Sequence, residues 1–545
     1  MPLEECKYGP ACYRKNPSHF QEFSHPWLEE AVMDSDESKK PCTPCINEDA
    51  TPEIIEDQNC AKDEIHLNKR KRSDSTSSSN SLSKSPITKT ARIQSNPLNM
   101  YLTKVKGMDE SVNNFCSIGI IEILSSKWGQ LQESAQFNYM FEVEWLIDKY
   151  PPCFRHLPML LVHQDKRETT AQLEAETAPY GNIDLAKARL NDAFGTHHTK
   201  MMLLRYEDTL RVVIHTANLI EQDWREKTQG VWLSPLFPLF KEDEEPRDKS
   251  PTKFQTDLIL YLRSYKSKAV DHWCELLKKY DMSEAKVFII GSTPGRHTGA
   301  DLHKFGHMKL RKILSSNHAT CENVQANWPV IGQFSSIGSL GAKSEAWLQG
   351  EFLQSLGTTP KRFTAFTKPP LKLVFPCVED VRNSLEGYKA GGSLPYSDST
   401  HQKQLYLTKF LHRWKSDKKG RTRASPHIKS YFRVSPDMKQ IHYAVLTSAN
   451  LSKAAWGGLE KQSSQLCIRS YELGVLFLPK IFGQQDTFVV SDGLVVDGDG
   501  EKDPISFPVP FDLPLTRYGD EDQPWRWDVC YKSIPDSHGD VWIPS

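Results

Sequence analysis

A short pattern of polar residues occurs twice in this chain of 545 residues. In the first copy, Asn218 follows His198-Thr199-Lys200, 20 positions after the histidine. In the second copy, Asn450 follows His427-Ile428-Lys429, 23 positions after the histidine. Each Asn is followed by Leu and, six positions after the Asn, by a Trp. Because residue types, order and spacing recur together, we infer an internal duplication that builds one site at the junction of two halves.

The length and composition of the chain limit the kinds of protein it can be. At 545 residues it is too long for one hydrophobic core, so we expect two or more units. Its formal net charge of −1 excludes a uniformly basic coat for nucleic acid but is compatible with a local positive groove. No apolar run is long enough to span a bilayer and the acidic start is no secretory signal, which predicts a soluble intracellular protein without a membrane partner. Its 12 cysteines, many of them single in apolar surroundings, are typical of reduced packing residues.

A polar segment separates the N-terminus from the rest of the chain. Residues 29–96 are rich in Asp, Glu, Ser, Lys, Thr and Pro and poor in apolar residues, which predicts a disordered linker. Within it, Lys69-Arg70-Lys71-Arg72 precedes a serine-rich run. This basic cluster is either a solvated charge run or a nuclear-import signal. Its place in an exposed tail favours the import signal, and therefore a nuclear protein.

Alternating strand and helix patterns begin near Pro97. Apolar repeats at helical spacing predict helices at 254–265 and 273–277. Short buried strands are predicted at Met201–Leu204, Leu210–His215, Val287–Ile290, Leu373–Phe375, Tyr443–Leu446 and Gly474–Leu478. This alternation predicts an α/β fold in layers, with an N-terminal half at 97–286 and a C-terminal half at 287–545.

The duplicated residues suit one kind of chemistry. A single histidine beside a strand is more often a core residue than a catalyst, and a lysine there usually reaches to solvent; the recurrence argues for a functional site. One neutral imidazole can attack a phosphodiester, and a second can protonate the leaving oxygen and later deprotonate water. Ammonium groups and amides can stabilise the charge that develops on the phosphate oxygens. No ring of Asp and Glu accompanies the motifs, so we expect neither a two-metal mechanism nor a catalytic cofactor.

Beyond the two motifs, longer strings resemble the tyrosyl-DNA phosphodiesterase family, a branch of the phospholipase D superfamily with Asn where the usual motif has Asp. The strings are Phe194–Met202, Thr216–Leu219, Lys227–Gly230, His427–Lys429, Thr447–Trp456, Arg469–Pro479 and Pro524–Pro544. The resemblance covers residues 97–545. It implies two similar phospholipase D-like halves of α-β-α layers, with the active site at their junction.

The resemblance also implies a role for each polar residue of the two copies. His198 is expected to be the nucleophile and His427 the general acid, then the base. The groups expected to grip the phosphate are Lys200, Lys429, Asn218 and Asn450. Gln229 and Glu472 are expected to orient the histidines, because the partner of one ring nitrogen decides which nitrogen can react. His197 is the weaker candidate, since it lies outside the His-x-Lys register.

Residues that contact substrate are less visible in the sequence. Ser336 and Ser339 lie in a Ser/Gly-rich segment that suits phosphate but reads equally well as a plain turn. In the family this segment and the Ser after the second Asn-Leu, here Ser452, contact DNA. Three aromatic residues are candidates to stack on a base or on the leaving tyrosine, although each is more often a core residue: Phe194, Tyr139 and Trp527.

A second pattern lies at the N-terminus. Two thiolates and two imidazoles with zinc-like spacing are supplied by Cys6, Cys12, His19 and His25. The alternative is four unconnected residues in a frayed terminus. The segment at 1–28 resembles the poly(ADP-ribose)-binding zinc finger, which implies a structural zinc ion, with Tyr8, Tyr13 and Arg14 contacting the polymer. Leu3 stands where that family usually has a basic residue, which bears on polymer affinity more than on metal binding.

Together these features predict a nuclear DNA-repair phosphodiesterase that removes 3′-end adducts through a covalent phosphohistidine. The implied partners are single- or double-stranded DNA with blocked 3′ ends, a topoisomerase I-derived peptide and poly(ADP-ribose), and the implied state is a monomer. A lipid-cleaving phospholipase D is the rival enzyme, disfavoured by the Asn in place of Asp. A catalytically inactive poly(ADP-ribose) adaptor is the rival binding protein, disfavoured because both His-x-Lys pairs are intact.

Overall fold

The computed structural model describes residues 4–5, 23–24 and 96–544, apart from residues 115, 165–166, 191, 193, 361–367, 484–485 and 492–503. The chain divides into two compact units, residues 1–93 with Ser545 and residues 94–544. In the first unit, β1 (Glu4–Glu5) pairs in parallel with β2 (Phe23–Ser24). The four expected zinc ligands, and residues 29–95 of the expected linker at 29–96, lie outside the described residues.

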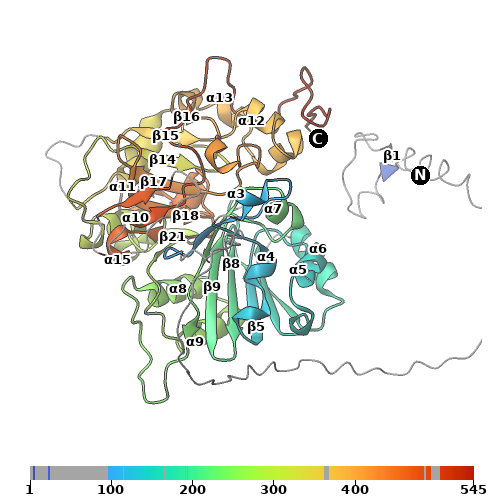
Figure 1. The fold of residues 1–545 in the computed structure, drawn as a ribbon, viewed down its shortest axis with the longest axis vertical. Helices are drawn as coiled ribbons and strands as arrows, with labels where there is room; N and C mark the ends of the chain where they lie inside the picture. Colours follow the sequence, from blue (N-terminus) through green and yellow to red (C-terminus); the bar gives the residue numbers. More distant parts are fainter. Residues whose placement is uncertain are drawn as a thin grey trace, which may run out of the picture. The chain divides into compact units, whose positions relative to one another are not determined.

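The second unit contains two large mixed sheets (Figure 1). The first has the strand order β4-β3-β10-β9-β8-β5-β6-β7, with β11 paired to β9. Its strands are β3 (Met100–Thr103), β4 (Ser117–Ile118), β5 (Leu131–Phe137), β6 (Met159–Gln164), β7 (Ile183–Ala188), β8 (Met201–Tyr206), β9 (Thr209–His215), β10 (Gly230–Leu233) and β11 (Phe237–Pro238). This sheet occupies the cyan and green part of Figure 1.

The second sheet has the order β12-β21-β18-β17-β14-β15-β16, with β22 paired to β18 and β23 to β22. Its strands are β12 (Phe288–Ser292), β14 (Val330–Gln333), β15 (Leu371–Val374), β16 (Leu411–His412), β17 (Ser430–Val434), β18 (Gln440–Thr447), β21 (Glu472–Phe477), β22 (Phe488–Val490) and β23 (Ser506–Phe507). A small third sheet joins β13 (Gly295–Thr298), β20 (Gln465–Ile468) and β19 (Gly458–Glu460).

The two large sheets repeat one topology. The order β3-β10-β9-β8-β5-β6-β7 corresponds strand by strand to β12-β21-β18-β17-β14-β15-β16. The pairings also match in direction, because the first four in each series are antiparallel and the last two parallel. The duplication inferred from a few polar residues therefore extends to the whole sheet.

Side chains alternate between two cores along the central strands. On β8, Leu203 faces a core shared by both sheets, whereas Leu204 faces the helices outside the first sheet. On β18, Leu446 and Val445 divide in the same way between the shared core and the helices outside the second sheet. Both faces of these strands are thus buried, which explains why they read as nearly continuous apolar runs. Each fully buried leucine stabilises the fold by about 2 kcal/mol.

Helices cover the outer faces and one side of the shared core. Residues of α4 (Ile120–Ile123), α5 (Val143–Asp148), α6 (Arg167–Thr177) and α7 (Glu221–Arg225) join the outer core of the first sheet. Residues of α10 (Gly306–Leu314), α11 (Leu353–Leu356), α12 (Val378–Arg382) and α14 (Lys453–Trp456) join that of the second. The shared core includes α8 (Phe254–Arg263) and α9 (Lys268–Leu277). The remaining α-helices of the described residues are α3 (Glu110–Asn113), α13 (Asp398–Gln402) and α15 (Pro479–Phe482).

The expected elements agree with this fold. The six predicted strands are confirmed as β8, β9, β12, β15, β18 and β21, and the two predicted helices as α8 and α9. The predicted α/β class, with sheets layered against helices, is likewise confirmed. Among the described residues, no helix combines the length and the apolar character that crossing a membrane requires.

Candidate active site

The two polar motifs occupy equivalent places in the two sheets. His198 and Lys200 immediately precede β8, and Asn218 follows β9. In the same way, the second His-x-Lys precedes β17 and Asn450 follows β18. Because β8 and β9 correspond to β17 and β18, the duplicated topology presents both sets of side chains at the same end of their sheets.

The two halves meet closely at β10. A Cβ atom added at Gly230 would lie only 2.5 Å from Leu446 Cδ1 and 2.7 Å from Ile428 Cδ1, both in the second half. A side chain at this position would displace the ends of those two side chains, so the glycine lets the backbone of β10 lie close against the other half. This close packing brings the ends of β9, β10, β18 and β21 together.

Each motif histidine is fixed by a backbone hydrogen bond to the opposite half. The N–H of His198 donates to Tyr471 O at 2.9 Å, and the N–H of His427 donates to Thr228 O at 3.0 Å. Tyr471 precedes β21 and Thr228 lies two residues before β10, which are equivalent strands. The histidines are therefore placed by the junction itself and not by their own sheets alone.

The side chain of His198 is oriented by a carboxylate from the second half. Its Nδ1 lies 2.9 Å from Glu472 Oε2, and the hydroxyl of Ser448 donates to the same oxygen at 2.5 Å. Since the carboxylate accepts, Nδ1 carries the proton and Nε2 has a free lone pair. Burial lowers the pKa of His198 and Glu472 opposes this effect, so the ring is a neutral imidazole with Nε2 ready to react.

The side chain of His427 is oriented by an amide from the first half. Its Nδ1 lies 3.1 Å from Gln229 Oε1, which also accepts from the Thr216 hydroxyl at 2.8 Å. Gln229 Nε2 lies 3.0 Å from the same Nδ1 and also donates to Asp223 O at 3.2 Å. Nδ1 of His427 is therefore held by the Gln229 amide, and Nε2 is the ring nitrogen left for reaction.

Two buried lysines complete the duplicated arrangement. Both side chains are fully buried, and each Nζ donates to the carbonyl oxygen two residues earlier, Lys200 to His198 O at 3.2 Å and Lys429 to His427 O. Burial lowers the pKa of Lys200 to about 8. The pKa of Lys429 falls well below its usual value because of burial and then the charge of Lys200. An anionic phosphate bound beside them would favour the charged form of both lysines.

The two asparagines differ in their surroundings. Asn450 Oδ1 accepts from the backbone N–H groups of Ser335 and Ser336, both at 3.0 Å, which leaves its NH₂ group as the donor for a ligand. Asn218 is held through its backbone, whose N–H donates to Asp223 Oδ2 at 2.7 Å. Within the described part of the chain, Asn218 Oδ1 accepts no hydrogen bond.

The expected DNA-contacting serines lie on two adjoining segments. Ile337 and Leu451 form a parallel bridge, which brings Ser336 and Ser339 alongside Ser452. The Ser336 hydroxyl donates to Pro395 O at 2.7 Å, and the Ser452 hydroxyl accepts from Ala455 N as the cap of α14. Ser339 is exposed.

The three aromatic candidates differ in their distance from the motif residues. The ring of Tyr139 lies 5.9 Å from that of His198, and Lys200 Nζ lies 5.9 Å from the centre of the tyrosine ring. Phe194 is 79% exposed and Trp527 is 45% exposed. Phe194 and Trp527 are therefore not core residues, and that alternative is wrong for both.

Comparison with known proteins agrees with this geometry. Residues 99–519 match the model of the tyrosyl-DNA phosphodiesterase family. The chain belongs to this family. Residues 3–28 match the PBZ domain, so this phosphodiesterase also carries a PBZ zinc finger at its N-terminus.

Relatives of the phosphodiesterase share most of its length. Tyrosyl-DNA phosphodiesterase 1 of Drosophila melanogaster is 34% identical over 597 residues, covering 96% of this chain and 99% of its own. The protein of that name in Arabidopsis thaliana is 38% identical over 492 residues, covering 82% of this chain and 76% of its own. The crystal structure of the yeast tyrosyl-DNA phosphodiesterase superposes with a TM-score of 0.59 at 20% identity, covering 78% of this chain and 98% of that one, which shows a shared fold.

His197 is a structural residue in this phosphodiesterase. It is fully buried, with Nδ1 3.0 Å from Asn138 O and Nε2 2.9 Å from the Tyr265 hydroxyl. Burial lowers its pKa to about 3, so the ring is neutral and both of its nitrogens are engaged. This position agrees with the sequence, in which His197 was the weaker catalytic candidate because it lies outside the His-x-Lys motif.

Three polar contacts of the site were missed in the sequence. The hydroxyls of Thr216 and Ser448 support Gln229 and Glu472, and a recognisable signal existed, because each stands two residues before the motif Asn. Asp223 contacts His427 and had no such signal, because the second copy has Ala at the equivalent spacing.

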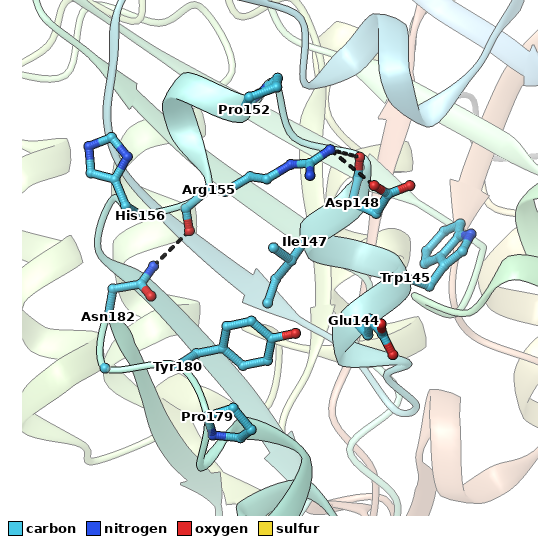
Figure 2. Close-up of a pocket in the computed structure, with 11 residues that line it drawn as sticks. Glu144, Trp145, Ile147, Asp148, Pro152, Arg155, His156, Pro179, Tyr180 and Asn182 are labelled. Carbon is cyan, nitrogen blue, oxygen red and sulfur yellow. Dashed lines mark hydrogen bonds and ion pairs between the residues drawn. The ribbon is translucent and has the colours of Figure 1, made fainter. Parts of the chain in front are cut away.

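A cavity elsewhere on the phosphodiesterase is not part of this site. It has a volume of about 800 Å³ and lies beside α5 and the turn that follows (Figure 2). Arg155, which lines it, is paired with Asp148 at 3.0 Å. None of the predicted catalytic residues lines it, and the carboxylates of Glu144 and Asp148 at its wall would repel a phosphodiester.

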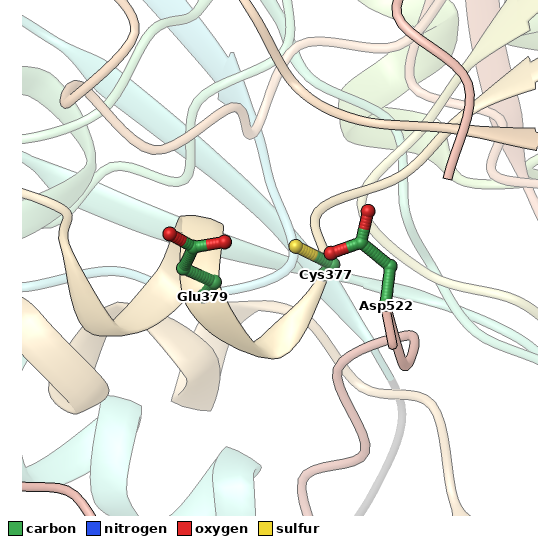
Figure 3. Close-up of side chains that lie close together, drawn as sticks. All are labelled: Cys377, Glu379 and Asp522. Atoms are coloured by element: carbon green, nitrogen blue, oxygen red, sulfur yellow. The ribbon is translucent and has the colours of Figure 1, made fainter. Parts of the chain in front are cut away.

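Three side chains of types that bind metals lie close together, but an arginine accounts for their arrangement. Cys377, Glu379 and Asp522 lie close together (Figure 3). The guanidinium of Arg413 lies among them, 2.9 Å from Glu379 and 3.8 Å from Asp522. Burial and the neighbouring Asp380 raise the pKa of the Cys377 thiol far above neutrality, so it stays protonated. The arginine supplies the positive charge that these carboxylates need.

Proposed function

We propose that this chain is a DNA-repair phosphodiesterase that hydrolyses 3′-phosphotyrosyl and related 3′-end adducts, releasing topoisomerase I remnants from DNA. One observation carries the proposal. Each half orients the histidine of the other, with Glu472 on His198 and Gln229 on His427. The family to which the chain belongs and this exchange of partners support the same chemistry: a neutral imidazole as nucleophile and a second imidazole that gives and takes a proton at Nε2, beside two buried lysines.

In the first step His198 Nε2 attacks phosphorus. The P–N bond forms and the bond from phosphorus to the tyrosine oxygen breaks, while His427, protonated on both ring nitrogens at this stage, gives its Nε2 proton to that oxygen and becomes neutral. Glu472 stabilises the positive charge that develops on the His198 ring. The products are free tyrosine, or a tyrosyl peptide, and a phosphohistidine linked to the DNA 3′ end.

In the second step, His427 acts in the opposite direction. Its Nε2 takes a proton from water, the water oxygen attacks phosphorus and the P–N bond breaks, which leaves a 3′-phosphate and restores His198. Lys200, Lys429, Asn218 and Asn450 hold the non-bridging oxygens in both steps.

We further propose how the chain meets DNA. The adjoining segments with Ser336, Ser339 and Ser452 bind backbone phosphates, and Phe194, Tyr139 and Trp527 stack on bases or on the leaving tyrosine. The DNA is single- or double-stranded with a blocked 3′ end, and the enzyme acts as a monomer. The halves at 97–286 and 287–545 act together as one catalytic unit. The linker carries the basic cluster that directs the protein to the nucleus.

We expect the intact protein to release tyrosine from a 3′-phosphotyrosyl oligonucleotide at the same rate with and without EDTA. The reason is that the paired lysines stand where a cation would otherwise neutralise phosphate charge. Product would be followed on a denaturing gel. A loss of activity in EDTA that magnesium restores, or cleavage of phosphatidylcholine in place of the oligonucleotide, would contradict the proposal.

The PBZ segment has a separate proposed role. Cys6, Cys12, His19 and His25 form a donor set of two thiolates and two imidazoles, which fits a tetrahedral structural zinc ion. We propose that the folded finger binds poly(ADP-ribose) and recruits the enzyme to damaged DNA without contributing to catalysis.

Replacing Cys12 and His19 by alanine is therefore expected to remove zinc and poly(ADP-ribose) binding. Turnover of a short oligonucleotide should stay within about twofold of the unaltered protein, because a linker of this composition leaves the finger independent. Zinc content, a polymer-binding assay and the cleavage rate would be measured together. Retained polymer affinity, or a collapse of turnover, would exclude an independent recruitment finger.

A further inference from the structure

A file of three buried charged side chains, Asp223, Lys227 and Glu386, starts beside His427. The two chemical steps described above do not use these side chains. Asp223 on α7 places Oδ2 at 3.4 Å from His427 Nδ1. Its other oxygen lies 3.5 Å from Lys227 Nζ, and Lys227 reaches Glu386 of the second half at 3.4 Å. The side chains of Asp223 and Lys227 are each only 1% exposed, and that of Glu386 is 5% exposed. Charges are rarely buried so deeply without a purpose or a partner.

The surroundings of His427 make protonation difficult. Burial, followed by the charges of nearby cations, holds the pKa of His427 well below its usual value. The groups that lower it are Lys429, Lys200, Lys227 and His198. Its hydrogen-bond partner Gln229 is a neutral amide, whereas His198 has the carboxylate of Glu472. A general acid in this position needs a negative charge from another source.

We propose that Asp223 is the counter-ion that lets His427 carry its proton to the leaving tyrosine oxygen. It is a positioning residue, since it touches His427 and not the substrate. The same carboxylate oxygen accepts from the N–H of Asn218 at 2.7 Å, so Asp223 also ties the general acid to a phosphate-gripping residue. The proposal rests on the phosphodiesterase function proposed above and assigns this residue a place in its first step.

The rest of the file continues from Asp223 into the second half. Lys227 forms an ion pair with Asp223 on one side and with Glu386 on the other. Gln222 donates to Glu386 at 2.7 Å, and burial raises the pKa of Glu386 to about 7. Because Glu386 lies at the far end, its loss should affect His427 much less than the loss of Asp223.

The test uses Asp223→Asn, which keeps the shape of the side chain and an oxygen for the Asn218 N–H. Two oligonucleotides would be compared in single turnover at saturation, one with a 3′-phosphotyrosine and one with a 3′-(4-nitrophenyl) phosphate. We expect release of tyrosine to slow about 10- to 100-fold, and release of nitrophenol by less than about threefold, because nitrophenolate leaves without a proton. In the tyrosyl reaction the alkaline limb of the rate against pH should move to lower pH by about one unit.

Glu386→Gln is the matched control, since it removes a buried carboxylate from the same file without touching His427. Its tyrosine release and alkaline limb should match those of the unaltered protein. If Asp223→Asn fails to fold, Lys227→Gln carries the test, and its alkaline limb should move to higher pH. Equal losses with both oligonucleotides, an unmoved limb, or the same defect in Glu386→Gln would overturn the proposal. An unaltered protein that cleaves neither oligonucleotide would instead refute the function itself.

Discussion

Replacing His198 by alanine is expected to lower the rate of tyrosine release by at least about 10⁴-fold, because no other group can form the covalent phosphoenzyme. The neighbouring His197 cannot substitute, since it is buried with both ring nitrogens engaged by Asn138 and Tyr265. Release of labelled tyrosine in single turnover would measure the loss, and a gel under denaturing conditions would show no covalent complex.

A matched rescue separates chemistry from folding in this variant. Added imidazole can occupy the space of the missing ring and attack phosphorus as tyrosine leaves. Water then cleaves the new P–N bond, which gives the 3′-phosphate and frees the imidazole. We therefore expect imidazole to restore part of the activity of His198→Ala, while the melting temperature stays near that of the unaltered protein. Residual activity above about one per cent without imidazole would contradict the assignment of His198 as nucleophile.

The sequence predicted the central strands well because they are buried on both faces. The residues of β8, β9, β18 and β21 face the shared core and the outer helices in turn, so their apolar runs are long and unambiguous. Some other strands were not recognised, although β9 was predicted despite its buried Arg211. On β17, Arg433 is fully buried and donates to Gly357 O and Gln325 O, and a charged residue in a short run hides a strand.

The proposed catalytic residues could be picked out in the sequence, but their partners could not be derived from spacing. The bond from His198 to Glu472 joins residues 274 positions apart, and that from His427 to Gln229 joins residues 198 positions apart. Only the way in which two duplicated sheets pack at Gly230 decides that each orienting residue serves the opposite half. Spacing within one half would have paired Gln229 with His198 instead.

Asp223 shows the limit of reasoning from a duplication. A repeated pattern identifies functional residues that both halves contain. It gives no signal for a functional residue that only one half contains. Asp223 has no counterpart after Asn450, yet it lies beside the histidine whose partner is a neutral amide. The presence of Asp223 beside only one histidine fits the different roles proposed for the two, because a nucleophile and a general acid need different charges nearby.

Replacing His427 by alanine is expected to slow the two steps unequally. The tyrosine oxygen, with a pKa near 10 in its free phenol, leaves with only about a 100-fold loss when no acid assists it. Water is a far weaker acid, so hydrolysis of the phosphohistidine without a base should fall by about 10³- to 10⁴-fold.

The slower second step should make a covalent complex of His427→Ala with DNA accumulate. A labelled oligonucleotide would report it as a band of protein size on a denaturing gel, which decays over hours. The double variant His198→Ala with His427→Ala is the control and should give no such band, because the band requires the His198 ring. Equal slowing of both steps without a trapped species would mean that His427 does not act as the base. In that case, the carboxylate of Glu472 on His198 would be the next candidate to examine.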